Sequence, residues 1–134
     1  MGEKVTLSGV PETMLQTIYA RAKETKTRGA ISDKKAVEIV EKLNYDFSLA
    51  DKDKAMHDGV IARTIVLDRL AEKYLAKLKN AVVVNIACGL DTRCYRMKGF
   101  SHWYNLDLPE TIEVRSRILT PTEKITQIPM SAMD

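Results

Sequence analysis

The chain has 134 residues, 45% of them hydrophobic and 29% charged, which fits one domain with a modest core. Its net charge of +3 comes from lysines scattered among acids, so composition gives little support to nucleic-acid binding. No apolar run reaches the roughly 18 residues of a membrane-spanning helix, and the start lacks a signal-peptide pattern. We therefore expect a soluble, cytoplasmic protein that has no membrane partner. Cys88 and Cys94 do not belong to a sequence pattern of metal-binding residues, so we expect no metal site. Two free cysteines also fit a reducing compartment.

The first half of the chain carries helical periodicity and is predicted to form a helical cap. Pro11 suits the first turn of one helix, and Asp33 can cap a second. The expected elements are a helix that ends near Gly29, a helix from Asp33 to about Leu43, a polar connection over residues 44–53, and a long helix over residues 54–78.

The apolar stripe of the long helix has one charged member. The apolar positions are Met56, Val60, Leu67, Leu70, Tyr74 and Leu78. Arg63 stands where the stripe needs a residue between Val60 and Leu67. A guanidinium on a core-facing stripe needs an anionic partner, which is either a structural carboxylate or the carboxylate or phosphate of a ligand.

Residues 82–130 alternate short apolar strands with shorter helices, the pattern of a parallel sheet. The first strand, residues 82–86, is apolar on both faces, as expected of a central strand. Gly89 then permits a tight turn and the close approach of a ligand to the backbone. The second strand, residues 102–106, leads to Asp107, 18 residues after Gly89. A carboxylate there can accept the hydroxyl hydrogens of a ribose, although a simple turn and cap would use the same residues.

Pro109 is expected to start the next helix, and a third strand over residues 124–130 leads to Ser131. Together these elements predict an α/β fold, in which a helical cap (residues 1–80) precedes the first half of a Rossmann-like parallel sheet (residues 81–134). We treat them as a single, truncated domain with about three strands.

The turn after the first strand argues against a dinucleotide. A nicotinamide dinucleotide site uses the pattern G-x-G-x-x-G under a pyrophosphate. The corresponding stretch, Ala87 to Thr92, lacks both outer glycines and carries Asp91 where a diphosphate would approach. A cationic ligand without phosphate fits better, and S-adenosylmethionine is the obvious candidate.

Two short motifs carry a resemblance to a known family. Gly89-Leu90-Asp91-Thr92-Arg93 with Tyr95-Arg96, followed by Asn105-Leu106-Asp107-Leu108-Pro109-Glu110, resembles the leucine carboxyl methyltransferase and polyketide O-methyltransferase group of class I S-adenosylmethionine-dependent methyltransferases. Upstream stretches agree with that group: Arg21–Thr25, Ile31–Asp33 with Ala36, Tyr45–Phe47, and Ala62–Thr64 with Asp68.

The resemblance implies a role for particular residues. Arg63 would hold the carboxylate of the methionine moiety, with Arg21 a weaker candidate for the same end. Gly89 would lie under the methionine portion, and Asp107 would bind the ribose hydroxyls. Leu106 and Leu108 would lie beside the adenine, and Ser131 or Ala132 would lie near its edge. Asp91 and Arg93 would form a pair that shapes the turn. Ala87 occupies a position where the family commonly has a glycine.

The resemblance also implies transfer of a methyl group to an oxygen of a small-molecule or carboxylate-bearing acceptor, with S-adenosylhomocysteine as the product. Positioning of donor and acceptor dominates such a reaction, so we expect no catalytic dyad.

Two other classes stay open: a non-catalytic binding or regulatory module, and, less favoured, a nicotinamide-dependent oxidoreductase. Because members of the group are about twice this length, the chain would supply the donor-binding half, and its first strand would be an open edge. We therefore expect either a fragment of a longer enzyme or a homodimer that pairs through that edge.

Overall fold

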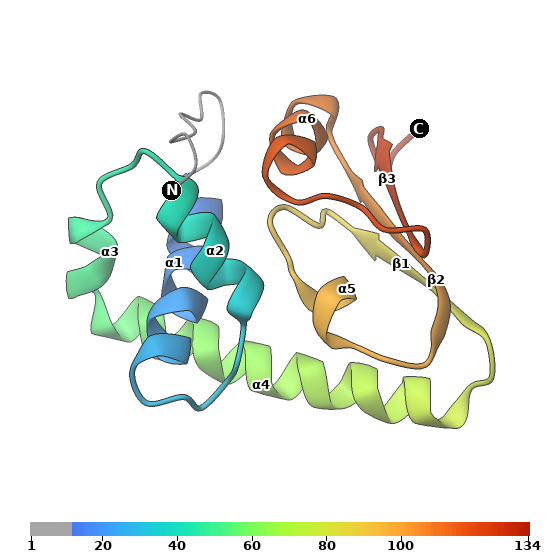
Figure 1. The fold of residues 1–134 in the computed structure, drawn as a ribbon, viewed down its shortest axis with the longest axis horizontal. Coiled ribbons are helices and arrows are strands. Elements are labelled where there is room, and N and C mark those ends of the chain that lie inside the picture. The colour runs from blue at the N-terminus through green and yellow to red at the C-terminus, as the bar shows by residue number, and fades with distance from the viewer. Residues whose placement is uncertain (1–11) are drawn as a thin grey trace. The chain divides into compact units, whose positions relative to one another are not determined.

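The computed structural model describes residues 12–134, which form helices followed by a parallel sheet (Figure 1). The elements are α1 (Glu12–Lys26), α2 (Lys34–Lys42), α3 (Ser48–Lys52), α4 (Lys54–Lys77), β1 (Ala81–Ile86), α5 (Arg93–Arg96), β2 (Phe100–Asp107), α6 (Pro109–Ile118) and β3 (Ile125–Pro129). Pro11 lies outside the described residues. The predicted α/β class, with an N-terminal helical region and a three-stranded parallel sheet, is confirmed. Among these helices, none is long and apolar enough to cross a membrane.

The chain divides into two compact units, and the boundary between them in the sequence falls within α4. The first unit ends at Asp68, and the second covers Arg69–Asp134. In the first unit, the side chain of Asp33 accepts a hydrogen bond of 3.0 Å from the backbone N–H of Ala36, as a helix N-cap should. Its buried apolar side chains come from four of the helices: Leu15, Ile18, Ala20, Ile39, Ala50, Val60 and Ile61.

The polar connection predicted over residues 44–53 contains a short helix, α3, which was not predicted. The carboxylate of Asp46 accepts a hydrogen bond from the backbone N–H of Ser48 at 3.0 Å, which satisfies one donor at the helix start. Phe47 stacks on Tyr19 of α1 with ring centroids 4.7 Å apart. This aromatic contact holds the segment in place.

Glu24 joins three parts of the first unit. Its side chain is fully buried, and its carboxylate accepts hydrogen bonds from Arg28 at 3.0 Å and from the backbone N–H of Ala30 at 3.1 Å. His57 Nε2, on α4, lies 2.9 Å from the same carboxylate. The hydrogen bonds with His57 and Arg28 lower the pKa of Glu24 to about 2. The carboxylate is therefore charged and fully engaged inside the protein.

The second unit is built on a sheet with the strand order β1-β2-β3 and parallel pairing throughout. Asn105 of β2 and Gln127 of β3 are neighbours in register, so they lie on the same face. Asn105 contacts Cys94 of α5 and Gln127 contacts Ser116 of α6, which places both helices over that face (Figure 1). One buried core cluster of this unit is made of Leu75, Cys94, Met97, Trp103 and Ile125.

The other face of the sheet is bare along β1. Val82, Val84 and Ile86 are 58%, 55% and 59% exposed, whereas Ala81 and Val83 pack against the core. The prediction that β1 is buried on both faces was therefore wrong for the described chain. A central parallel strand needs helices on both faces, and here α5 and α6 supply one layer.

Candidate functional site

The carboxyl ends of the three parallel strands form one edge of the sheet. Ile86 pairs in register with Leu106, and Leu106 pairs with Ile128, so the strands end at the same level. The residues that follow them are the predicted site residues of the second half: Ala87 and Gly89 after β1, Asp107 and Leu108 at the end of β2, and Ser131 and Ala132 after β3. In open α/β sheets, ligands bind in the crevice outside this edge.

Gly89 and Asp107 are in direct contact. The backbone N–H of Gly89 donates a hydrogen bond of 2.9 Å to Asp107 Oδ2, and the N–H of Leu108 donates one of 2.7 Å to Oδ1. These two bonds fix the carboxylate at the end of β2 and leave further lone pairs on both oxygens, because an ionised carboxylate offers about four acceptor sites. The Asp107 side chain is only partly buried. It therefore meets the requirements for accepting two hydroxyl hydrogens from a ribose.

The turn between β1 and α5 uses a left-handed backbone twice. Gly89 has φ of +50° and Ala87 has φ of +57°. Glycine adopts this conformation freely, whereas an alanine is strained by its Cβ. The turn is closed by a hydrogen bond of 2.9 Å from the N–H of Asp91 to the carbonyl of Cys88. The glycine that the resemblance implies at the position of Ala87 would avoid this strain.

Asp91 and Arg93 form the predicted ion pair, with Arg93 Nη1 2.7 Å from Asp91 Oδ1. The other oxygen of Asp91 accepts hydrogen bonds of 3.1 Å from the Asn85 side chain and from the backbone N–H of Arg93. The carboxylate therefore ties the end of β1 to the start of α5. Its contribution is to hold the shape of the turn.

Arg115 is a part of the site that the sequence reading missed. The side chain is fully buried, Nη1 donates a hydrogen bond of 3.1 Å to the carbonyl of Gly89, and Nη2 lies 3.6 Å from Cys94 Sγ. Its Nε has no hydrogen-bond partner among the described residues. The Gly89 peptides are thus held from two sides, by Asp107 at the N–H and by Arg115 at the C=O. The spacing of Ile112, Arg115 and Ile118 on one face of α6 could have revealed this buried arginine.

The two cysteines beneath the turn are free and buried. Burial raises the pKa of Cys88 to about 11 and also raises the pKa of Cys94. Because the thiolate is the nucleophilic form, neither residue is suited to nucleophilic catalysis at neutral pH.

The remaining predicted residues near the sheet edge differ in exposure. Leu108 is exposed, so its apolar side chain is accessible just after the end of β2. Ser131 is half-buried, and its hydroxyl accepts a hydrogen bond of 3.1 Å from the N–H of Met133. Ala132 is exposed.

Arg63 and Arg21 belong to the first unit. Arg63 is exposed and makes no ion pair or hydrogen bond with any described residue, so the expectation that it faces the core was wrong. The reason is that α4 buries a different face, which includes Ile61 and Thr64, whereas the later residues of the predicted stripe are exposed: Leu67, Leu70, Tyr74 and Leu78. Arg21 is buried, and its Nε lies 3.0 Å from Asp33 Oδ2. A structural carboxylate thus engages Arg21, whereas the guanidinium of Arg63 is open to a ligand.

Comparison with known proteins identifies the family of the chain. The model of the leucine carboxyl methyltransferase family matches residues 14–131. The chain is 40% identical over 124 residues to the tetracenomycin polyketide synthesis O-methyltransferase TcmP of Streptomyces glaucescens, a match that covers 88% of this chain and 45% of that protein. It is 31% identical over 128 residues to the S-adenosyl-L-methionine-dependent methyltransferase dpfgK of Gibberella zeae, covering 87% of this chain and 43% of that protein.

The chain therefore spans somewhat under half the length of these relatives. The family match reaches from α1 to the end of β3, so it includes both the helical region and the edge that carries Gly89 and Asp107. By this match the chain belongs to the leucine carboxyl methyltransferase family.

Proposed function

We propose that this chain binds S-adenosylmethionine at the carboxyl edge of its sheet and serves as the donor-binding part of an O-methyltransferase. The observation that carries the proposal is the Gly89–Asp107 contact, which fixes an acceptor carboxylate beside a left-handed glycine turn. The names of the two relatives support the same donor and, for one of them, transfer to oxygen. The proposal therefore covers the methyl donor, the transfer of the methyl group to oxygen, and a methyl acceptor that is a small molecule or bears a carboxylate.

Each site residue is assigned one task. Asp107 accepts the ribose hydroxyls, the Gly89 peptides lie against the methionine portion, and Leu108 provides an apolar contact for the adenine. Ser131 and Ala132 lie near the adenine edge, and Arg63 binds the α-carboxylate. When bound, the donor supplies a sulfonium methyl group for in-line transfer. The protein's part is to hold the donor and exclude water. A carboxylate acceptor is already deprotonated, so it does not require a general base.

A second candidate function is a donor-binding or regulatory module without chemistry. The coverage of 45% and 43% of the two relatives supports it, because more than half of each of those proteins has no counterpart in the match. A module that keeps the donor site would share it with the enzyme. A methyl-transfer assay separates them only after binding has been established.

Isothermal titration with S-adenosylhomocysteine tests the donor site. We expect saturable 1:1 binding, and Asp107→Ala should weaken it tenfold or more, about 1.4 kcal/mol, because the ribose loses both acceptor oxygens. Glu123→Ala, which removes an exposed carboxylate before β3, is the matched control and should bind as the wild type does.

Arg63→Ala should also weaken the titration tenfold or more, because the α-carboxylate loses its guanidinium, about 1.4 kcal/mol at the least. Arg69→Ala removes another exposed guanidinium from α4 and should have no effect. Absence of binding by a folded wild-type sample would refute the proposal, and wild-type affinity in both site variants would show that the site is assigned wrongly. Preference for a nicotinamide dinucleotide would revive that alternative.

A further inference from the structure

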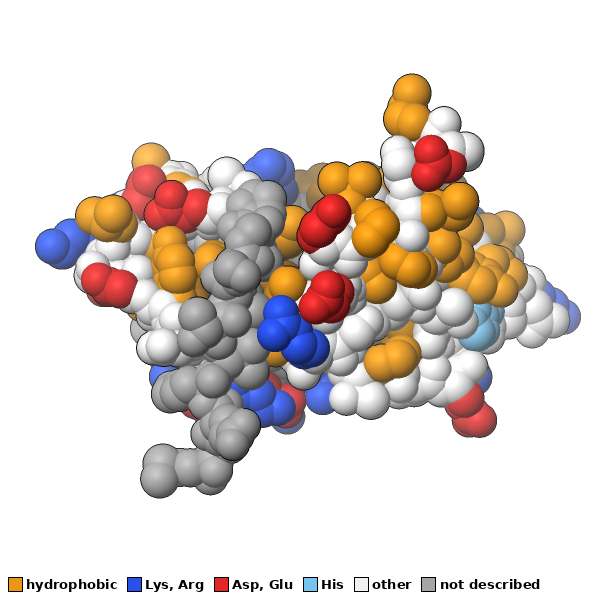
Figure 2. Space-filling view, turned by 90° about the horizontal axis from the view of Figure 1, so that it is seen from above, with side chains coloured by type: hydrophobic (Ala, Val, Ile, Leu, Met, Phe, Trp, Pro, Cys, Tyr) orange, Lys and Arg blue, Asp and Glu red, His pale blue; other side chains and the backbone are white. Residues whose placement is uncertain are grey.

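Arg115 of α6 is a buried cation that has no carboxylate partner in the described chain. Among the described residues two arginines are buried, Arg21 and Arg115, whereas Figure 2 shows other Lys and Arg side chains in blue at the surface. Arg21 pairs with Asp33, but the described residues give Arg115 no ion pair. Burial of an unpaired charge is costly, so packing alone does not explain an arginine at this position.

The hydrogen bonds of Arg115 direct its guanidinium to the turn after β1. Nη1 donates to the carbonyl of Gly89 at 3.1 Å, and Nη2 lies 3.6 Å from Cys94 Sγ. The same sulfur lies 3.6 Å from Asn105 Nδ2, and Trp103 Nε1 donates to Asn105 Oδ1 at 2.9 Å. A continuous chain of polar contacts therefore leads from the indole to the Gly89 carbonyl.

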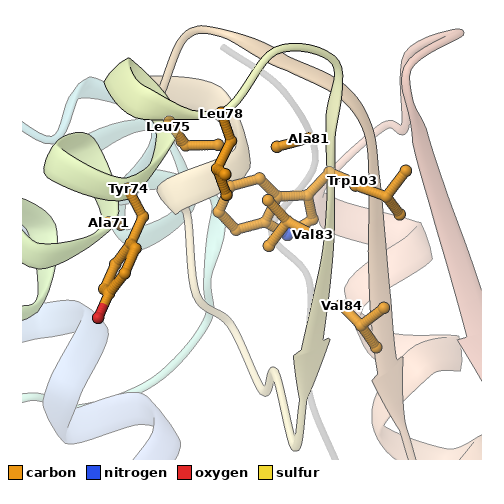
Figure 3. A pocket seen from close by; sticks show the side chains of 9 residues that line it. Ala71, Tyr74, Leu75, Leu78, Ala81, Val83, Val84 and Trp103 are labelled. Atoms are coloured by element: carbon orange, nitrogen blue, oxygen red, sulfur yellow. The ribbon is translucent and has the colours of Figure 1, made fainter.

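The far end of this chain of contacts lies in the buried core. Trp103 is buried, and Figure 3 shows its indole beside Leu75 and Leu78. Its ring also meets that of Phe100 edge-on, with centroids 5.2 Å apart. The core thus fixes the position from which the guanidinium donates. A hydrogen bond from a charged donor is roughly twice as strong as one between neutral groups, so it can hold a peptide carbonyl in one direction.

The segment that carries Arg115 also carries the ribose end of the proposed site. Asp107 and Leu108 directly precede α6, and the N–H of Ile112 donates to the carbonyl of Leu108 at 3.0 Å. Asp107 accepts from the N–H of Gly89, while Arg115, within the helix, donates to its carbonyl. The two groups that fix the Gly89 peptides therefore come from one continuous segment and are held in register by the helix.

We propose that Arg115 is a positioning residue for the methionine portion of the donor, on which it acts through the Gly89 carbonyl. The inference rests on the proposed function, in which the Gly89 peptides lie against that portion and Asp107 binds the ribose. Without Arg115 the carbonyl can turn away, because a glycine backbone has little preference of its own. Asp107 keeps the hydrogen bond from the N–H of Leu108. Loss of Arg115 should therefore weaken contacts with the methionine portion and spare those with the ribose.

Isothermal titration of the full chain with two ligands tests this assignment. S-adenosylhomocysteine has the complete amino-acid end, whereas 5′-methylthioadenosine keeps the adenosine and the sulfur but lacks that end. Arg115→Met should bind the first about fivefold more weakly than the wild type and the second within about twofold of it. Its urea midpoint should be equal or higher, because an unbranched apolar side chain replaces a buried charge. A purely structural role would instead lower the midpoint and weaken both ligands.

Further variants supply the rescue and the control. Arg115→Lys keeps a charged donor and should bind S-adenosylhomocysteine within about threefold of the wild type. Arg117→Met removes an exposed arginine from the same helix and should leave both affinities unchanged. Where Arg115→Met does not fold, Arg115→Gln takes its place. It keeps a neutral N–H donor and should show a smaller loss that is confined to S-adenosylhomocysteine.

Three outcomes would overturn the inference. One is wild-type affinity for S-adenosylhomocysteine in Arg115→Met, and another is an equal loss of both ligands. The third is failure of both Arg115→Met and Arg115→Gln to fold, since the arginine would then serve the fold alone. A folded wild type that binds neither ligand would refute the donor site itself, and the inference with it. Wild-type binding with an unaffected Arg115→Met would leave the donor site in place and remove only Arg115 from it.

Discussion

Ala87 has a backbone conformation that its own side chain opposes. Its φ of +57° costs a non-glycine residue about 1–2 kcal/mol, whereas a glycine adds about 0.5–1 kcal/mol of entropic cost on folding. We therefore expect Ala87→Gly to raise the free energy of unfolding by about 0.5–1 kcal/mol. Loss of the methyl group should also tighten binding of S-adenosylhomocysteine, because the ligand can approach the turn more closely.

Asn80 supplies the matched control for this prediction. It also has a left-handed backbone, with φ of +54°, but asparagine tolerates this conformation better than alanine does. Asn80→Gly should therefore change the urea midpoint less than Ala87→Gly, and it should leave ligand binding unchanged. Equal effects of the two substitutions would show that strain at Ala87 is not special.

Single residues were predictable where spacing alone decides their role. The position of Asp107 at the end of a strand follows from local order along the chain, whereas the Asp91–Arg93 pair was implied by the family resemblance. Arg115 was missed because an arginine within a helix is ordinarily read as solvated, and only its register with Ile112 and Ile118 places it under Gly89. Arg63 was predicted to face the core but is exposed. An apolar stripe on a helix indicates a buried face only where another element packs against it.

At the scale of elements, the link between α1 and α4 through Glu24 predicts a pH dependence of stability. The pKa of Glu24 is lowered to about 2 from an ordinary value of 4.5, chiefly by the hydrogen bonds with His57 and Arg28. A lowered pKa in the folded state means that the unfolded chain takes up the proton first as the pH falls. The stabilisation is therefore complete above the ordinary value and is lost progressively between about pH 4.5 and pH 2.

Chemical denaturation at pH 5, 4 and 3 measures this effect. The unfolding free energy of the wild type should fall over that range, and Glu24→Gln should fall less steeply from a lower starting value at pH 5. Glu38→Gln, on the exposed surface of α2, should keep the wild-type slope. A Glu24→Gln variant with the full wild-type slope would mean that other carboxylates account for the acid sensitivity.

The elements themselves were more predictable than their environment. Periodicity located α1, α2, α4, α6 and all three strands, because alternation and helical spacing are local properties of the chain. The helix α3 escaped prediction because the stacking of Phe47 on Tyr19 is a tertiary contact. The prediction that β1 is buried on both faces was wrong. Hydrophobic side chains on both faces indicate a strand that can be buried on both, but its actual burial depends on which other elements pack against it.

At the scale of the whole molecule, the proposed ligand should report on both units at once. In the proposed assignment Asp107 of the second unit binds the ribose and Arg63 of the first binds the α-carboxylate, so protection of both by one ligand tests that assignment. Ligand that binds only the folded form adds stability by mass action, about 2.7 kcal/mol at a hundredfold excess over Kd. Hydrogen exchange with saturating S-adenosylhomocysteine should therefore slow in residues 86–108 and also in residues 60–66.

A ligand that lacks the amino-acid end separates the two contributions. 5′-Methylthioadenosine keeps the ribose and the adenine but has no α-carboxylate, so it should protect residues 86–108 and leave residues 60–66 unchanged. Arg63→Ala should give the same pattern with S-adenosylhomocysteine, because the carboxylate then has no guanidinium to bind. Identical protection of residues 60–66 by the two ligands would remove Arg63 from the site while leaving Gly89 and Asp107 in it. The helical region would then act through its fold alone, and the donor site would lie entirely within the second unit.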